Sequence, residues 1–172
     1  MAKAKNISSY HVAVAAEAFA AGLFAQAGCD VSIQYGANQP GYDLVVGKDK
    51  RLMKISVKGS QDGGWGLVQS YKSPGVNYHQ TADLWLKDQS SDTIFCLVQF
   101  EDVPLGQCPR TYLASPKEVA NYLKKARNNN GSTILCEHYT YKKGLGAGCT
   151  DKIPDEWNFS VNRIKSLLEA VN

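Results

Sequence analysis

The sequence lacks the cysteine patterns that build disulfide frameworks and zinc sites. Its five cysteines are odd in number and widely scattered, and no two of them form a C-x-x-C pair. Such a distribution indicates reduced thiols. The sequence also lacks an apolar run long enough to cross a bilayer. After MAKAKN, an alanine-rich stretch broken by Glu17 stands where a secretory signal would have an uninterrupted apolar core, so we expect a cytoplasmic protein.

The sequence also lacks a large excess of either positive or negative charge. The chain has 19 Lys and Arg residues against 16 Asp and Glu residues, a net charge of +3, which permits a polyanionic partner without requiring one. The hydrophobic fraction of 44% and the charged fraction of 20% are those of an ordinary globular protein. At 172 residues the chain is long enough to bury a core, and we expect a single domain over residues 1–172.

What the sequence does contain is an alternation of helical and strand patterns, which predicts an α/β fold with a mixed β-sheet between helices. Each of the first three helices is preceded by a side chain that can cap it: Ser8 or Ser9, Asn77 and Ser115. Residues 59–76 form a long polar, glycine-rich loop, and such loops are usually functional or mobile. The predicted helices are 8–28, 77–89, 115–129 and 159–171, and the predicted strands are 30–36, 42–48, 51–58, 93–101, 109–114 and 132–142.

The stretch 42–61, YDLVVGKDKRLMKISVKGSQ, predicts a β-hairpin that turns at Asp49 and Lys50. Side chains alternate between the two faces of a strand. A one-residue slip would therefore mix apolar and charged residues on one face, so the pattern fixes the register. The predicted cross-strand pairs are Lys48 with Arg51, Gly47 with Leu52, Val45 with Lys54, and Asp43 with Ser56.

One face of this hairpin is polar, whereas the other is continuously apolar. Opposed residues in a hairpin lie about 5 Å apart and diagonal neighbours about 7–8 Å, so Asp43, Ser56 and Lys58 converge on one patch. Glu17 adds a carboxylate that has no cation four residues away along its helix. Two carboxylates beside a lysine indicate a Mg²⁺ site. Glu17 belongs to the helical stripe that we expect to face the sheet, with Tyr10, Val14, Ala20, Ala21 and Phe24.

A first helix with Glu17, followed by Y-D-L-V-V, a turn and I-S-V-K-G, resembles the PD-(D/E)xK nuclease superfamily of restriction-endonuclease-like and Holliday-junction-resolvase-like enzymes. The resemblance covers residues 8–100. It implies a restriction-endonuclease-like core and an endonuclease that hydrolyses DNA phosphodiester bonds with Mg²⁺ or Mn²⁺. On this resemblance Asp43 and Glu17 would bind the metal together with the backbone carbonyl of Val57, and Lys58 would be the catalytic lysine.

The chain departs from the family pattern at Ser56, where the family has an acid. We include Ser56 among the catalytic residues, because its hydroxyl can hydrogen-bond a water or the lysine. Asp83 is the first candidate for a relocated acid, and Asp62 is the second. The alternative is that the metal site is lost with Ser56. The chain would then be a catalytically degenerate nuclease-fold module that binds nucleic acid or a protein partner without cleavage.

Four residues after the hairpin are predicted to contact DNA. Gln61 can reach a phosphate, and Trp65, Tyr71 and Lys72 combine aromatic rings with a cation, which suits base stacking and backbone contact. Packing of the loop is the alternative role for Trp65 and Tyr71. An enzyme that cuts both strands of DNA would favour a symmetric homodimer.

Two basic segments receive no functional role from the sequence. The cations of the third helix, among them Arg127, are interpreted as a solvated helix face. The segment KKGLGAGC (142–149) has the glycines of a phosphate loop but not the G-x-x-x-x-G-K-[ST] order, and no helix follows it. We therefore interpret this segment as a flexible connector.

Overall fold

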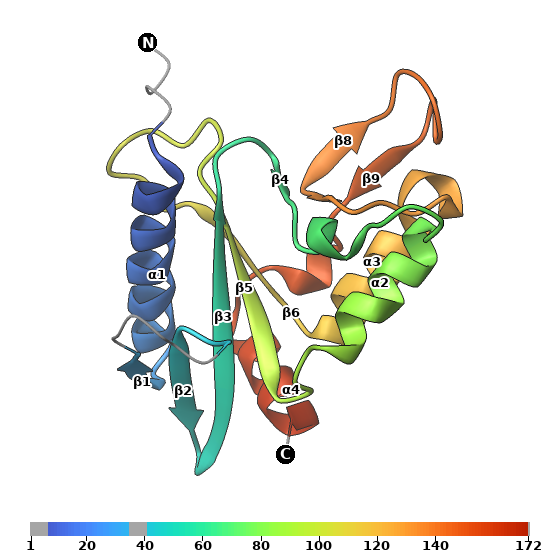
Figure 1. Ribbon diagram of the computed structural model, residues 1–172. Helices are drawn as coiled ribbons and strands as arrows, with labels where there is room; N and C mark the ends of the chain where they lie inside the picture. The colour runs from blue at the N-terminus through green and yellow to red at the C-terminus, as the bar shows by residue number, and fades with distance from the viewer. Residues whose placement is uncertain (1–6, 35–40, 172) are drawn as a thin grey trace. The chain divides into compact units, whose positions relative to one another are not determined.

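The computed structural model describes residues 7–34 and 41–171 (Figure 1). The chain divides into two compact units, each assembled from separate segments. The segments of the two units alternate along a single chain, so this division does not test the expectation of one domain, which stays a prediction. Unit 1 consists of Met1–Asp62, Ser91–Ser115 and Glu156–Asn172, and unit 2 consists of Gly63–Ser90 and Pro116–Asp155.

Unit 1 is built on a five-stranded mixed sheet with the strand order β1-β2-β3-β5-β6. Only the β3–β5 pair is parallel, and the other neighbouring strands in this sheet are antiparallel. The predicted α/β class with a mixed sheet is therefore confirmed. The strands are β1 (Asp30–Ile33), β2 (Leu44–Lys48), β3 (Arg51–Ser60), β5 (Thr93–Gln99) and β6 (Arg110–Ala114).

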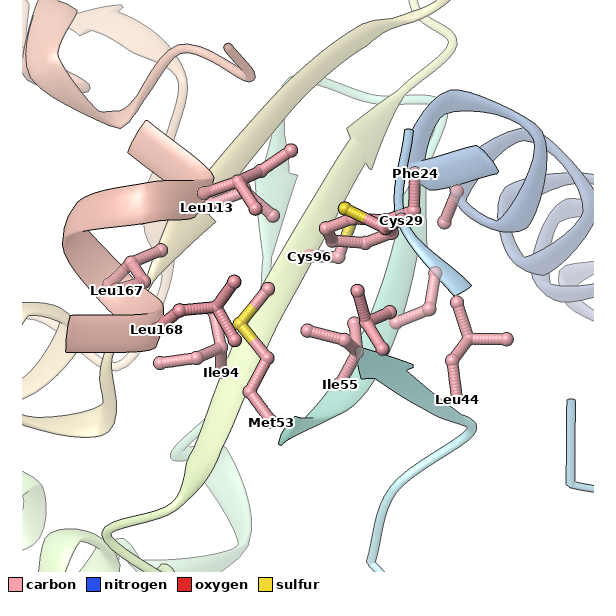
Figure 2. Close-up of a cluster of buried hydrophobic side chains, with 14 of the residues drawn as sticks. Phe24, Cys29, Leu44, Met53, Ile55, Ile94, Cys96, Leu113, Leu167 and Leu168 are labelled. Carbon is pink, nitrogen blue, oxygen red and sulfur yellow. The ribbon is translucent and has the colours of Figure 1, made fainter. Parts of the chain in front are cut away.

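Two helices, α1 (Ser9–Gln26) and α4 (Val161–Val171), bury one core against this sheet. Residues two apart on the central strands supply the sheet side of that core, because alternate side chains of a strand share a face. Figure 2 shows strand side chains meeting Phe24 of α1 and Leu167 and Leu168 of α4. The strand members of this cluster include Met53, Ile55, Val57, Ile94, Cys96, Val98 and Leu113.

The face that α1 buries differs from the predicted stripe. Tyr10 and Val14 are 71% and 49% exposed, so their assignment to the inward face was wrong. Apolar residues lie all around this alanine-rich helix, and their spacing therefore cannot select one face. The buried face is instead the one that approaches β3 closely, where a Cβ on Gly59 would lie 2.8 Å from Cγ1 of Val12. The buried residues of α1 are Val12, Ala16, Ala20 and Phe24.

Unit 2 combines two helices with four short strands. Helices α2 (Tyr78–Lys87) and α3 (Pro116–Asn129) pack against each other. The strands form two separate pairs. The pairs are β4 (Gly64–Trp65) with β7 (Leu135–Cys136), and β8 (His138–Thr140) with β9 (Thr150–Lys152). Two 3₁₀ turns complete the chain, η1 (Gln69–Tyr71) and η2 (Asp155–Trp157).

The prediction of one strand over residues 132–142 was wrong, because the segment changes partner at Glu137. The Glu137 N–H donates to the Gly63 carbonyl at 2.9 Å, and the Glu137 carbonyl accepts from the Ile153 N–H at 2.9 Å. The chain therefore leaves one strand pair and enters the other at this residue. The predicted loop 59–76 likewise contains the end of β3, β4 and η1.

The predicted helix starts are confirmed at α1 and α2. The Ser8 hydroxyl accepts from the His11 N–H, and Asn77 forms a capping box with Gln80. Within residues 7–34 and 41–171, no helix is both long and apolar enough to span a bilayer.

Candidate active site

The β2–β3 hairpin sets the positions of the candidate catalytic residues. Its turn has positive φ at Asp49 (51°) and Lys50 (66°), the backbone of a tight two-residue hairpin. The observed ladder ends at the pair of Leu44 with Ile55, and the predicted pair of Asp43, the residue before β2, with Ser56 is not among the observed pairs. The observed pairs include Lys48 with Arg51, Gly47 with Leu52 and Val45 with Lys54, and the predicted register is confirmed for these three.

Asp43 is held by hydrogen bonds on both of its flanks. Its N–H donates to the Ile55 carbonyl at 2.8 Å, and its carbonyl accepts from the Gln34 N–H at 2.9 Å. Its carboxylate oxygen Oδ2 accepts from the Val57 N–H at 2.6 Å. The carboxylate thus replaces a backbone acceptor where the β2–β3 ladder ends, which fixes its orientation. Burial raises the pKa of the fully buried Cys96 thiol, and the negative charge of Asp43 raises it further.

Glu17 reaches the same place from α1. It directly follows Ala16, which packs against Gly59 of β3, and it is half-buried beside the buried stripe. Burial and the neighbouring Asp43 carboxylate raise the pKa of Glu17, and the Lys58 ammonium lowers it in part. The other two charged side chains that the sequence assigned to this patch, Asp43 and Lys58, therefore act electrostatically on Glu17.

Lys58 and Ser56 alternate along β3 with the core residues Ile55 and Val57. In the β3–β5 register Lys58 pairs with Leu97, and Ser56 pairs with Phe95. Lys58 is half-buried, whereas Ser56 is only 3% exposed. Ser56 is therefore a neutral, nearly buried hydroxyl two residues from Lys58 on the same strand.

The oxygen donors at this place fit a hard divalent cation. Glu17 and Asp43 are two carboxylates whose mutual repulsion raises the pKa of Glu17, and a bound cation would relieve that repulsion. The Val57 peptide lies against Asp43 through its N–H. Among the described residues no group of three or more His, Cys, Asp and Glu side chains could hold a metal. A pair of carboxylates is a donor set that Mg²⁺ can use, because this ion commonly takes one or two carboxylates and keeps several waters.

A polar chain at the end of β3 was missed by the sequence reasoning. The buried Gln99 amide donates from Nε2 to the Ser60 hydroxyl at 3.1 Å, and that hydroxyl donates to Oδ1 of Asp62 at 2.9 Å. Gln61, predicted to contact phosphate, donates from Nε2 to the Ile7 carbonyl at 2.8 Å. The signal was a glutamine inside an otherwise apolar strand. Its partner could be named only with the parallel β3–β5 pairing in hand.

The other predicted residues lie in unit 2. Trp65 is 3% exposed in β4, so its ring packs inside the unit. The Tyr71 hydroxyl donates to Oδ2 of Asp88 at 2.9 Å. Nζ of Lys72 lies 5.7 Å from the centre of the Tyr78 ring. A DNA contact by Tyr71 or Lys72 stays a prediction.

Asp83, the first candidate for a relocated acid, forms an ion pair with Lys124 of α3. Both residues belong to unit 2. The ion pair gives the Asp83 carboxylate a structural partner on the neighbouring helix, so a metal at this carboxylate would compete with that lysine. Asp62, the second candidate, accepts the Ser60 hydroxyl described above.

Comparison of the chain with family models, with curated proteins and with solved structures finds no match.

Proposed function

We propose that this protein is a Mg²⁺- or Mn²⁺-dependent endonuclease with a restriction-endonuclease-like core, which hydrolyses phosphodiester bonds of DNA. The observation that carries the proposal is the electrostatic effect of Asp43 and Lys58 on the half-buried Glu17, together with the hydrogen bond that fixes the Asp43 carboxylate on β3. Two acids and one ammonium in one place suit a reaction that must neutralise phosphate charge and activate water.

In hydrolysis a water oxygen bonds to phosphorus, the phosphorus–oxygen bond to the leaving sugar breaks, and a proton passes from the water to the leaving oxygen. When bound, Mg²⁺ or Mn²⁺ supplies Lewis acidity that polarises the phosphate and lowers the pKa of a coordinated water. Asp43 and Glu17 would hold it, and the Val57 N–H, which donates to Oδ2 of Asp43, would keep that carboxylate oriented. Lys58 would orient the water or stabilise the negative charge that develops on the phosphate. The Ser56 hydroxyl would position that water.

A cleavage assay with a matched lysine pair tests this proposal. Plasmid, single-stranded and branched DNA are each incubated with Mg²⁺ or with Mn²⁺ and the wild-type protein, Lys58→Ala or Lys54→Ala. Lys54 lies on the same strand and face as Lys58, but it forms an exposed ion pair with Asp92. We expect cleavage by the wild type and by Lys54→Ala, and a loss of at least a hundredfold in Lys58→Ala. Full activity of Lys58→Ala, or no cleavage of any substrate with either metal, would contradict the proposal.

The buried, uncharged Ser56 favours a second candidate, a nuclease-fold module that binds nucleic acid or a protein without cutting. With Ser56 in place of an acid, this patch has only two carboxylates. This candidate predicts that the wild type neither cleaves DNA nor responds to Mg²⁺ in thermal unfolding. It also predicts that Ser56→Asp, by adding a third carboxylate, creates a Mg²⁺-dependent rise in melting temperature. A wild-type response equal to that of Ser56→Asp would count against it.

A further inference from the structure

The net positive charge of the chain resides in unit 2. Unit 1 has ten Lys and Arg residues and ten Asp and Glu residues, so its formal charge is zero. Unit 2 has nine cations against six acids, which accounts for the whole net charge of +3. A polyanion would therefore be attracted to unit 2 rather than to unit 1. The cations of unit 2 are Lys72, Lys87, Lys117, Lys124, Lys125, Arg127, Lys142, Lys143 and Lys152.

Arg127 is the most constrained of these cations. Its guanidinium carbon lies 5.6 Å from the centre of the Tyr78 ring and 5.2 Å from that of Tyr141, a cation–π contact with each ring. Its Nε is the one buried side-chain nitrogen or oxygen, among the described residues, that has no hydrogen-bond partner. No carboxylate within the described ranges forms an ion pair with it. The guanidinium is thus fixed, partly dehydrated and not neutralised by an acid.

The backbone beneath this arginine is fixed as well. α3 loses its helical backbone at Ala126, and Arg127 itself has φ of +55°, an energetically unfavourable region for a residue with a side chain. The Asp151 carboxylate accepts the Arg127 N–H through both oxygens, at 3.1 and 3.2 Å, and accepts the Tyr141 hydroxyl at 2.8 Å. The Asp151 carboxylate is therefore occupied by hydrogen bonds to the Arg127 backbone and to the Tyr141 hydroxyl, and these bonds fix both partners of the cation–π contact.

The glycine-rich segment 142–149 closes around the same arginine. A Cβ on Gly146, which has φ of +83°, would lie 2.7 Å from Cβ of Arg127, so only a glycine permits this contact. Lys142 and Lys143 directly follow Tyr141 and are exposed. The β8–β9 hairpin that carries them lies against the end of α3 within unit 2 (Figure 1). The segment is thus a built part of this cluster rather than a free connector.

From this geometry we infer that unit 2 has a binding surface for a nucleic-acid strand, centred on Arg127 between Tyr78 and Tyr141 and extended by Lys72, Lys142 and Lys143. Arg127 is half-buried with a buried Nε, and a guanidinium binds a phosphate through its terminal N–H donors. The exposed lysines supply point charges along a backbone, and the half-buried Tyr78 ring offers a face to an unstacked base. Tyr141 is only 8% exposed and supports Arg127 from within the unit. The inference shares its ligand class with the proposed function, but it requires binding and not hydrolysis.

An anisotropy titration tests the inference. A fluorescein-labelled single-stranded oligonucleotide is titrated in EDTA, where no metal-dependent cleavage occurs, with the wild type, Arg127→Gln, Arg127→Lys and the double variant Lys142→Ala/Lys143→Ala. We expect affinity to fall about tenfold or more in Arg127→Gln and in the double variant, with a shallower dependence on salt. Arg127→Lys should be intermediate, because it keeps the charge but loses the planar fork.

The matched control is Lys117→Ala/Lys165→Ala, which removes two exposed cations from α3 and α4. It should bind within about twofold of the wild type, since its charges lie outside the surface. Lys142 and Lys143 are exposed, so their double variant keeps the test valid if Arg127→Gln unfolds. The inference is overturned if the wild type does not bind, if the double variant binds as well as the wild type, or if polyglutamate displaces the oligonucleotide at equal charge. The last result would indicate an acidic protein partner.

This experiment separates the two proposals. Binding in EDTA that depends on Lys142 and Lys143, combined with no cleavage in Mg²⁺, would remove only the nuclease proposal. Cleavage that depends on Lys58, combined with binding that is indifferent to Arg127 and to the hairpin lysines, would remove only the unit 2 surface.

Discussion

Unit 1 and unit 2 differ in how they use charge. In unit 1 positive and negative charges are equal in number, and the notable group is a pair of carboxylates, Glu17 and Asp43, that a lysine only partly compensates. In unit 2 cations exceed acids, and Arg127 is held between aromatic rings without an ion pair among the described residues. A pair of carboxylates suits the binding of a cation, whereas a cationic, aromatic surface suits the binding of a polyanion.

The comparison predicts that the proposed catalysis and the proposed binding can be altered separately in this chain. Residues that would bind metal come from the five-stranded sheet and α1, and residues that would bind a nucleic-acid strand come from α2, the end of α3 and the β8–β9 hairpin. Each group has its own supporting hydrogen bonds, from Val57 to Asp43 in one unit and from Arg127 to Asp151 in the other.

The largest expected effect is that of Asp43→Asn, which tests whether the two units have separate roles. Asp43→Asn keeps the size of the side chain and an oxygen that can accept the Val57 N–H, but it removes the negative charge. We expect DNA cleavage to fall by at least a hundredfold while oligonucleotide affinity in EDTA stays within about twofold. Quantitative gel assays and anisotropy measure the two quantities. A parallel loss of affinity and cleavage would show that the two units do not divide the work.

Trp65 distinguishes a core residue of unit 2 from a binding residue. It is 3% exposed, and Trp65→Ala should lower the free energy of unfolding by about 3–5 kcal/mol through the cavity that it leaves. Denaturant titration measures the change, with Tyr139→Ala as the control, because Tyr139 is 51% exposed in the same unit. The control should shift stability by only about 0.5 kcal/mol. Equal effects of the two substitutions would place Trp65 on the surface.

A pair of valines on α1 sharpens the description of unit 1. Val12 is 5% exposed and packs near Gly59, whereas Val14 is 49% exposed. Val12→Ala should cost about 1–2.5 kcal/mol of unfolding free energy, and Val14→Ala about 0.5 kcal/mol or less. Chemical denaturation of both variants measures this difference. A larger loss in Val14→Ala would restore the stripe that the sequence predicted.

The smallest effect is a pH dependence of stability from Glu17. Folding raises its pKa, so the folded state binds this proton more tightly, and the stabilising contribution is lost as pH rises through the raised value. Glu17→Gln should therefore melt slightly higher than the wild type at neutral pH. The difference should vanish below the ordinary range of a glutamate, about pH 4. Thermal melts across pH measure it, and a Glu17→Gln protein that is less stable at neutral pH would contradict the assigned shift.

The sequence was most informative where a pattern repeats locally. The alternation in β2 and β3 determined the hairpin register, because a slip of one residue would bury charges. It failed at α1, whose apolar residues surround the helix, and at Glu137, where the chain changes partner strand. The contacts of Gln99 with Ser60 and of Arg127 with Asp151 join distant segments. Such pairs cannot be predicted from local spacing, and this is why Arg127 was interpreted as part of a solvated helix face.

The most direct test of the central claim is a calorimetric titration of Mn²⁺ into the wild type, Glu17→Gln and Asp43→Asn, with Asp83→Asn as the control. Asp83 is an acid of unit 2 that is paired with Lys124, so its loss removes an equal charge without touching either carboxylate of unit 1. We predict one site in the wild type and in Asp83→Asn, and at least a tenfold weaker site in each of the other two. Equal affinity in all four proteins, or no binding by the wild type, would show that these carboxylates do not share a cation.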